Sequence, residues 1–176
     1  MLSNEEMLLL AEKEGFCAAA MVSVDDIVFN GGFRKYCEDN LCGCYGANYS
    51  CPPDCGTIDE MRVRMQDYKN ALVVQTKWDI KDYTDRDAIR SAKKAHNEAM
   101  FRVIDQLGVK GVMGGASPCT LCEQCAIADG KPCRDEERRF SCLSAYCIDV
   151  AALAKKCGME YFCADGGIAL FGVYAF

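Results

Sequence analysis

Three closely spaced cysteines form the strongest chemical motif of this sequence. Cys119, Cys122 and Cys125 are separated from one another by two residues, and Cys133 follows after seven more. Such a tight loop is typical of proteins that hold a cubane iron–sulfur cluster, because the cluster offers a separate iron to each thiolate. A single zinc ion usually takes its thiolates from separated pairs. The motif therefore predicts a [4Fe-4S] cluster bound by these four cysteines, which we call the second site, and leaves zinc as the alternative.

Five further cysteines occur within the nineteen residues from Cys37 to Cys55. This stretch has neither a helical nor a strand period, so apolar burial alone does not offset the entropy of ordering it. A bound metal centre does so in small metal-binding loops. Buried free thiols are the alternative, but the interleaved Asp, Asn and Gly residues disfavour it. We therefore expect another metal centre here. Because it precedes the other along the chain, we call it the first site.

Composition limits what the rest of the chain does. The 176 residues, about half of them apolar, are enough for a single domain spanning 1–176 with its own core. The net charge of −6 argues against a nucleic-acid surface, since phosphate binding depends on concentrated Lys and Arg. The densest basic group is Arg134, Arg138 and Arg139, which stands among acidic residues. We interpret it as a solvated turn of mixed charge; the alternative is that these arginines offset the negative charge of a nearby cluster.

No export signal and no membrane span is expected from the sequence. We therefore expect a cytoplasmic protein, and in a reducing cytosol such cysteines bind metal more often than they pair as disulfides.

Helices and strands are expected to alternate along the chain. Capping boxes and apolar stripes predict helices over 4–13, 57–68, 84–107 and 146–157. Apolar and β-branched runs predict strands over 16–24, returning through 27–29, and over 71–78, 110–113, 159–163 and 168–174. The fold class expected is α/β or α+β, a single sheet with packed helices and two cysteine-rich loops projecting from it. The only histidine, His96, lies on the apolar stripe of the long helix, so we expect a packed core residue rather than a ligand.

The order of these motifs resembles a known family. The chain resembles the cysteine-rich "predicted metal-binding protein" family, a domain family of unknown function found largely in anaerobic bacteria and archaea. Three stretches carry the resemblance: the run from Cys37 through Cys51-Pro52-Pro53, the Cys119 to Cys133 motif with Arg134 after it, and the later Ala145-Tyr146 and Ile148-Asp149-Val150. The resemblance spans nearly the whole chain and implies metal or cluster binding.

The resemblance also implies a ligand set for each site. The family pattern falls on Cys37, Cys42 and Cys51 in the first site and on Cys119, Cys122, Cys125 and Cys133 in the second. This chain departs from it with Asp135-Glu136 after the Cys-Arg pair, with Cys147 at a position expected to be glycine, and with the additional Cys44 and Cys55. Cys44 is too near Cys42 for both to reach separate irons, so we expect Cys55 to complete the first site, with Cys44 as the alternative.

Three classes of function remain from the sequence. The first is an iron–sulfur protein with two [4Fe-4S] clusters that transfers electrons to a redox partner protein or supports an anaerobic redox enzyme. The second is an enzyme in which an open iron of the first site binds a substrate or sulfide. The third is a structural zinc module that contacts a partner.

Overall fold

The helices begin and end where local chemistry caps them. In the computed structural model, which describes residues 2–176, Ser3 and Glu6 form the capping box of α1 (Asn4–Lys13), and Thr57 and Glu60 form that of α3 (Ile58–Gln66). The long helix α4 (Arg86–Leu107) ends at Gly108, whose φ of 63° suits glycine. The shorter helices are α2 (Arg34–Glu38) and α5 (Val150–Lys156). Helices α1, α3 and α4 confirm three of the predicted helices.

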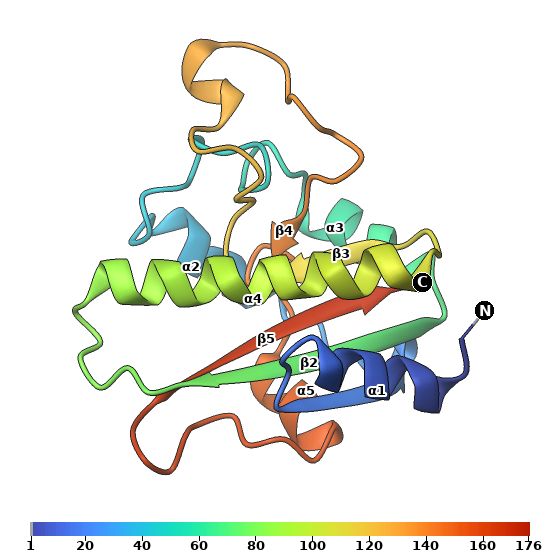
Figure 1. Cartoon of the computed structure of the whole chain (residues 1–176). Coiled ribbons are helices and arrows are strands. Elements are labelled where there is room, and N and C mark those ends of the chain that lie inside the picture. Colours follow the sequence, from blue (N-terminus) through green and yellow to red (C-terminus); the bar gives the residue numbers. More distant parts are fainter. Residues whose placement is uncertain (1) are drawn as a thin grey trace.

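The described residues form a single five-stranded sheet (Figure 1). Its strands are β1 (Ala18–Ser23), β2 (Asn70–Trp78), β3 (Val112–Gly115), β4 (Ser141–Cys142) and β5 (Ile168–Ala175). Their order across the sheet is β1-β2-β5-β3-β4, with antiparallel pairs throughout except for the parallel pair β3–β4. The sheet is therefore mixed, and the fold class is α+β, which confirms the single sheet with packed helices.

Each face of the sheet carries its own apolar core. Leu72 and Val74 of β2 pack with α1 and α4, whereas Ala71 and Val73 pack with α3 and α5. This division follows from the alternation of side chains along a strand. Figure 1 shows α1 and α4 in front of β2 and β5, so the sheet lies between two layers of helix and turn.

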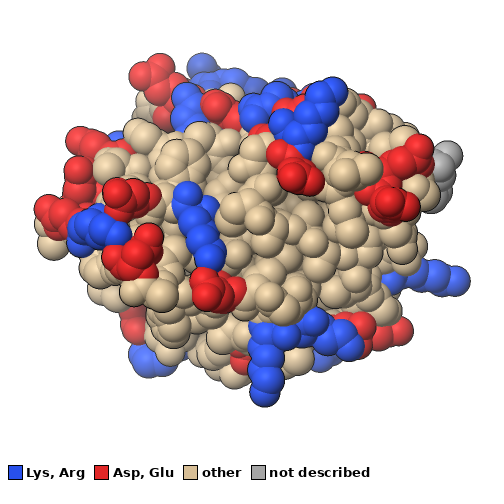
Figure 2. All heavy atoms as spheres, turned by 60° about the horizontal axis from the view of Figure 1, so that its bottom comes forward, with Lys and Arg blue, Asp and Glu red and all other residues tan. Residues whose placement is uncertain are grey.

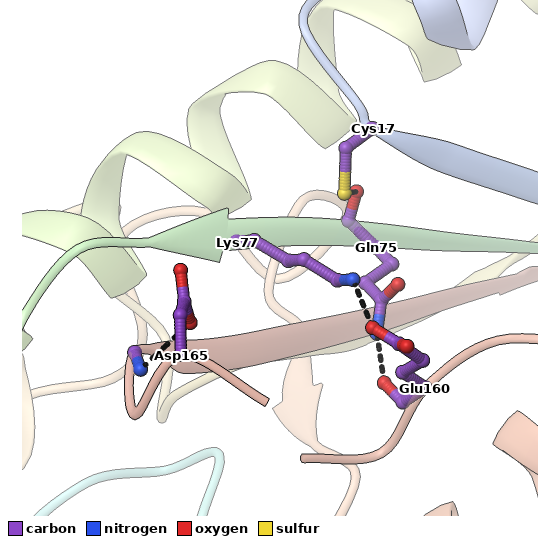
Figure 3. A network of polar contacts seen from close by, with 6 residues as sticks. Cys17, Gln75, Lys77, Glu160 and Asp165 are labelled. Carbon is purple, nitrogen blue, oxygen red and sulfur yellow. Dashed lines mark hydrogen bonds and ion pairs between the residues drawn. The ribbon is translucent and has the colours of Figure 1, made fainter. Parts of the chain in front are cut away.

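Two predicted strands are wrong. Residues 159–163 do not form a strand that pairs with the following one, because β5 is already paired with β2 on one side and β3 on the other. The segment is held by side chains instead: Lys77 pairs with the Glu160 carboxylate at 2.6 Å, and Gln75 Nε2 donates to the Glu160 carbonyl at 2.6 Å (Figure 3). Residues 27–29 do not return along β1 either, and Phe29 makes only an isolated bridge with Ile148.

One helix boundary also differs from the prediction. Helix α5 begins at Val150, capped by Asp149, rather than at Tyr146. The preceding residues form a tight turn in which the amides of Ala145 and Tyr146 both donate to the Cys142 carbonyl, at 3.0 and 3.2 Å. This turn follows β4, a strand that was not predicted, and it contributes to the first site.

Both cysteine-rich loops lie at the same end of the molecule, above β3 and β4 in Figure 1. On the face that Figure 2 shows, Lys and Arg alternate with Asp and Glu around a broad uncharged area. Within the part of the chain that the structure describes, no helix is both long and apolar enough to cross a membrane.

Candidate metal centres

The four cysteines of the second site surround one cavity. Cys119, Cys122, Cys125 and Cys133 all line it, and each is partly buried. The loop leaves the sheet at the end of β3 and turns back through a short 3₁₀ helix at 126–129, which ends at Gly130 with a φ of 63°. The sequence motif is therefore brought together around a common space.

Amide groups point at the sulfur atoms of this site. The Tyr49 amide donates to Cys125 Sγ at 3.5 Å. Burial raises the pKa of Cys119, and hydrogen bonds from the Leu121 and Phe140 amides oppose this shift. N–H groups directed at sulfur favour the thiolate, which is the form that binds metal.

Of the three arginines beside this site, two line its cavity. Arg134 and Arg139 do so, and Arg134 Nη1 donates to the Gln124 carbonyl at 2.8 Å. Hydrogen bonding to Cys122 outweighs burial and raises the pKa of Arg134. Arg138 instead pairs with Asp105 at 3.1 Å and lies 4.7 Å from the centre of the Phe101 ring. The role of offsetting cluster charge therefore fits Arg134, and the solvated-turn interpretation fits Arg138.

The first site is built against the protein core. Cys51 and Cys55 are 4% and 3% exposed, and the Cys55 amide donates to the Cys51 carbonyl at 2.9 Å, so the two lie one turn apart. Cys37 is carried by α2 and is half-buried, as is Cys44, whereas Cys42 is exposed. The predicted ligands thus come from one helix and one irregular loop.

Two cysteines outside the predicted set lie beside the first site. Cys142 ends β4, and Cys147 ends the turn that follows it, with a φ of 58° and no exposed surface. Neither belongs to a spacing motif, and only the departure of Cys147 from the family pattern pointed to this segment. The pairing of β4 with β3 brings it to the loop.

A buried arginine joins these segments. Arg34 is 7% exposed; its Nη2 donates to the Ala145 carbonyl at 3.2 Å, and its Nη1 lies 3.7 Å from Cys55 Sγ. Its Nε has no hydrogen-bond partner, although it is buried. Burial opposes the charge of this guanidinium, but Cys55 and Cys147 outweigh that effect and raise the pKa of Arg34. The groups that favour its charge are therefore the Cys55 and Cys147 side chains.

The thiols of the first site oppose each other's ionisation. Burial, and after it the charge of Cys142, raises the pKa of Cys37 to about 11. The same two causes, in the same order, raise the pKa of Cys51. Burial and the neighbouring Cys42 raise the pKa of Cys44. Several thiolates can coexist in so small a volume only when a cation neutralises them, so this donor set suits a metal centre.

The two sites share a hydrogen-bonded segment. Asn48 Nδ2 donates to the Cys119 carbonyl at 3.2 Å, and Ser50 Oγ accepts the Cys119 amide at 2.9 Å. The same Ser50 oxygen lies 3.9 Å from Cys51 Sγ, and Ser50 has no exposed surface. One buried hydroxyl thus contacts a candidate ligand of each site.

His96 is a core residue, as expected. It has no exposed surface, its Nδ1 lies 2.8 Å from Thr76 Oγ1, and its ring meets Phe16 edge-on at 5.3 Å. Burial lowers its pKa to about 4, so the ring is neutral at pH 7.

Between residues 2 and 176, no three His, Cys, Asp or Glu side chains stand together in an arrangement that could hold a single metal ion.

Fold and cysteine arrangement together define a cysteine-rich α+β domain with two candidate metal centres at one end of its sheet. The chain matches the family described as "Predicted metal-binding protein (DUF2284)" over residues 20–174, and it belongs to that family. The resemblance seen in the sequence is thereby confirmed. Neither the curated proteins nor the solved structures contain a match.

Proposed function

We propose that this protein is an iron–sulfur protein that binds two [4Fe-4S] clusters and transfers electrons. The observation that carries the proposal is the shared segment Asn48–Ser50, which bonds the first cysteine loop to the second. Two metal centres joined by partly buried hydrogen bonds suit electron exchange between them, because hydrogen bonds to sulfur and burial tune the potential of each cluster.

The residues fit such clusters. The ligands of the second site are Cys119, Cys122, Cys125 and Cys133. The Tyr49 amide donates a hydrogen bond to the sulfur of one of them, Cys125. In the first site, Cys37, Cys42 and Cys51 are ligands, and a further thiolate completes the set; Cys55 is the sequence-based candidate. The buried Arg34, whose charge is favoured by the neighbouring Cys55 and Cys147 side chains, supports a negatively charged centre at this site. Bound clusters would accept and donate single electrons there.

A redox partner protein would approach this end of the molecule. Leu41 is 81% exposed and Leu121 is 37% exposed, and each is adjacent in sequence to a predicted ligand. Exposed apolar side chains next to a cluster suit the small interfaces of electron-transfer encounters. In the cell, we expect this partner to be an anaerobic redox enzyme that the protein supports.

The decisive experiment is anaerobic purification followed by iron, sulfide and zinc analysis. We expect a brown protein with roughly eight irons and eight sulfides per chain, as two cubanes require. A matched variant, Cys122→Ala, should lose the second cluster, whereas Cys157→Ala, which changes a half-buried cysteine outside both sites, should lose none. Colourless protein with stoichiometric zinc would contradict the proposal and favour the structural zinc module.

A second candidate function follows from a cavity beside Cys55. This cavity, of about 410 Å³, is also lined by Arg64, Tyr68, Arg139 and Tyr146. Asp105, Glu136 and Glu137 also line it, so its charge is mixed. Its size and its acidic, basic and phenolic groups suit a small polar substrate, which would reach the first site if one iron lacked a thiolate. Addition of cyanide or a small thiol to reduced wild-type protein tests this: a changed magnetic resonance spectrum favours the enzyme, and an unchanged one favours the electron carrier.

A further inference from the structure

The chain between Cys125 and Cys133 folds back on itself. After the 3₁₀ helix at 126–129, the Lys131 amide donates to the Ala126 carbonyl at 3.1 Å. Ala126 follows Cys125 directly, and Lys131 precedes Cys133 by two residues. This bond therefore returns the seven intervening residues toward their start, which is how the widely spaced fourth cysteine reaches the other three.

Tyr49 of the first cysteine loop spans this returned segment. Its amide donates to Cys125 Sγ at 3.5 Å, and its hydroxyl donates to the Lys131 carbonyl at 2.8 Å. Figure 1 shows the second cysteine loop at the tip of the molecule, with the first loop beneath it. A single side chain of the first loop thus contacts the second loop next to its third cysteine and just before its fourth.

The backbone of Tyr49 is itself held in place by the residues on either side of it. Asn48 Nδ2 donates to the Cys119 carbonyl, and Ser50 Oγ accepts the Cys119 amide. The Ser50 amide also donates to Asn48 Oδ1 at 3.0 Å. A tyrosine side chain has only two torsion angles, so a fixed backbone largely determines where its hydroxyl lies. Tyr49 therefore acts as a rigid spacer between Cys125 and Lys131.

A different contact closes the second loop from within. Arg134, which follows Cys133, donates from Nη1 to the carbonyl of Gln124, which precedes Cys125, at 2.8 Å. This contact moves with the second loop, because both partners belong to it. Only the contacts from the first loop fix the two halves of the second site relative to the rest of the domain.

We infer that Tyr49 is a positioning residue of the second site, and that its amide and hydroxyl set the register of Cys133 against Cys119, Cys122 and Cys125. The inference rests on the proposed function only in requiring that the second site binds a metal centre. Metal ligands must be held close to their productive geometry by surrounding groups. A fourth ligand seven residues beyond the third needs such a group more than the three closely spaced ones do.

The test compares Tyr49→Phe and Tyr83→Phe in the full chain, reconstituted anaerobically with iron and sulfide. Tyr49→Phe removes the hydroxyl and keeps the ring and the amide. Tyr83→Phe is the matched control, because the Tyr83 hydroxyl donates to the Gly166 carbonyl at the same 2.8 Å and lies outside both sites. Cys122→Ala, which should lose the second cluster, identifies the signals of that site.

We expect Tyr49→Phe to weaken the retention of second-site metal against a chelator by about 3–10-fold, as the loss of one hydrogen bond allows. The magnetic resonance spectrum of the reduced second cluster should change, and that of the first should not. Tyr83→Phe should match the wild type in both measurements. In urea unfolding of the metal-free protein, the two variants should behave alike, because each loses one exposed hydrogen bond.

The outcomes separate this inference from the proposed function. Equal metal retention and unchanged spectra in Tyr49→Phe and Tyr83→Phe would overturn the inference, and so would a loss confined to the first site. If the wild-type protein holds zinc, the iron–sulfur proposal fails, yet a selective loss of second-site zinc from Tyr49→Phe would still support the positioning role. A wild-type protein that binds no metal at the second site would overturn it.

Discussion

Replacement of Arg34 by methionine tests whether the first site holds negative charge. Methionine replaces the unbranched stem of the side chain but removes the guanidinium, which lies 3.7 Å from Cys55 Sγ. Two opposite unit charges at about 4 Å attract each other by about 4 kcal/mol at an effective dielectric constant of 20, as an upper limit. Part of this is offset by the cost of burying the charges, so the net loss should be smaller. Removal of such an outer partner commonly weakens metal binding by about 10–100-fold.

The expected sign differs between the metal-loaded and the metal-free protein. In the loaded protein, Arg34→Met should weaken metal retention in the first site by about 10–100-fold. In the metal-free protein the thiols of the site are protonated, so the buried guanidinium is poorly paired and its Nε has no partner. There the same substitution should leave the free energy of unfolding unchanged or increase it, because an uncompensated buried charge is costly.

Competition with a chelator measures the first quantity and urea unfolding measures the second. Lys35→Met is the matched control, because it removes the same charge from the next residue, whose ammonium only pairs with Asp39 at the surface. Arg34→Lys should recover part of the affinity, since one ammonium cannot replace both guanidinium contacts. Equal metal retention in Arg34→Met and Lys35→Met would refute the reasoning, and so would a large loss of stability in the metal-free variant.

Two further predictions concern buried polar groups. Ser50→Ala should destabilise the protein by about 1–3 kcal/mol, because the Cys119 amide loses its acceptor. The same substitution should change the magnetic resonance spectra of both reduced clusters. A change confined to one cluster would contradict a hydroxyl shared by the two sites. For His96, the pKa of about 4 in the folded protein lies below the unfolded value of 6.5, so its contribution to stability is present above pH 6.5 and is lost as the pH falls toward 4. The loss should be roughly 3 kcal/mol across that range. The free energy of unfolding of the wild type and of His96→Gln is measured at pH 7 and at pH 4.5, and the difference between the two proteins should be smaller at pH 4.5. A constant difference would mean that His96 does not titrate in this way.

The parts of the fold that follow local rules were predictable from sequence. Capping boxes identified α1 and α3, and the positive φ of Gly108 ended α4 where the sequence placed it. These signals act within a few residues, so no knowledge of the tertiary structure is required. Strand β2 was equally readable, because both of its faces are buried and its first half is a continuous apolar and β-branched run.

The errors arose where pairing across the chain decides the structure. Residues 159–163 have the composition of a strand, but β5, the next strand along the chain, pairs with β2 on one edge and with β3 on the other. The two-residue strand β4 is too short to show a period, and its existence depends on β3. Side-chain bonds of Lys77 and Gln75 then hold the displaced segment without a ladder (Figure 3).

The same distinction explains how much of each site could be predicted. The second site is a local motif, and the structure gathers its four cysteines around one cavity as their spacing indicated. The first site is not local, because its surroundings include Cys142 and Cys147 from a segment about ninety residues beyond Cys55 in the sequence. A single cysteine between Ser141 and Leu143 carries no spacing signal, so sequence reasoning had no means of placing it beside the first site.

The difference between the sites has a consequence for how metal binding is coupled to folding. The second loop contains its own ligands and is held to the rest of the molecule mainly through Asn48, Tyr49 and Ser50. The first site shares Cys55 with the apolar core that packs under the sheet, and Arg34 connects it to the turn after β4. Because the shared segment belongs to the first loop, ordering of the first site also positions the donors that the second site uses. The first site therefore depends on the folded sheet, and the second site depends on the first, which is the order in which we expect the two centres to assemble.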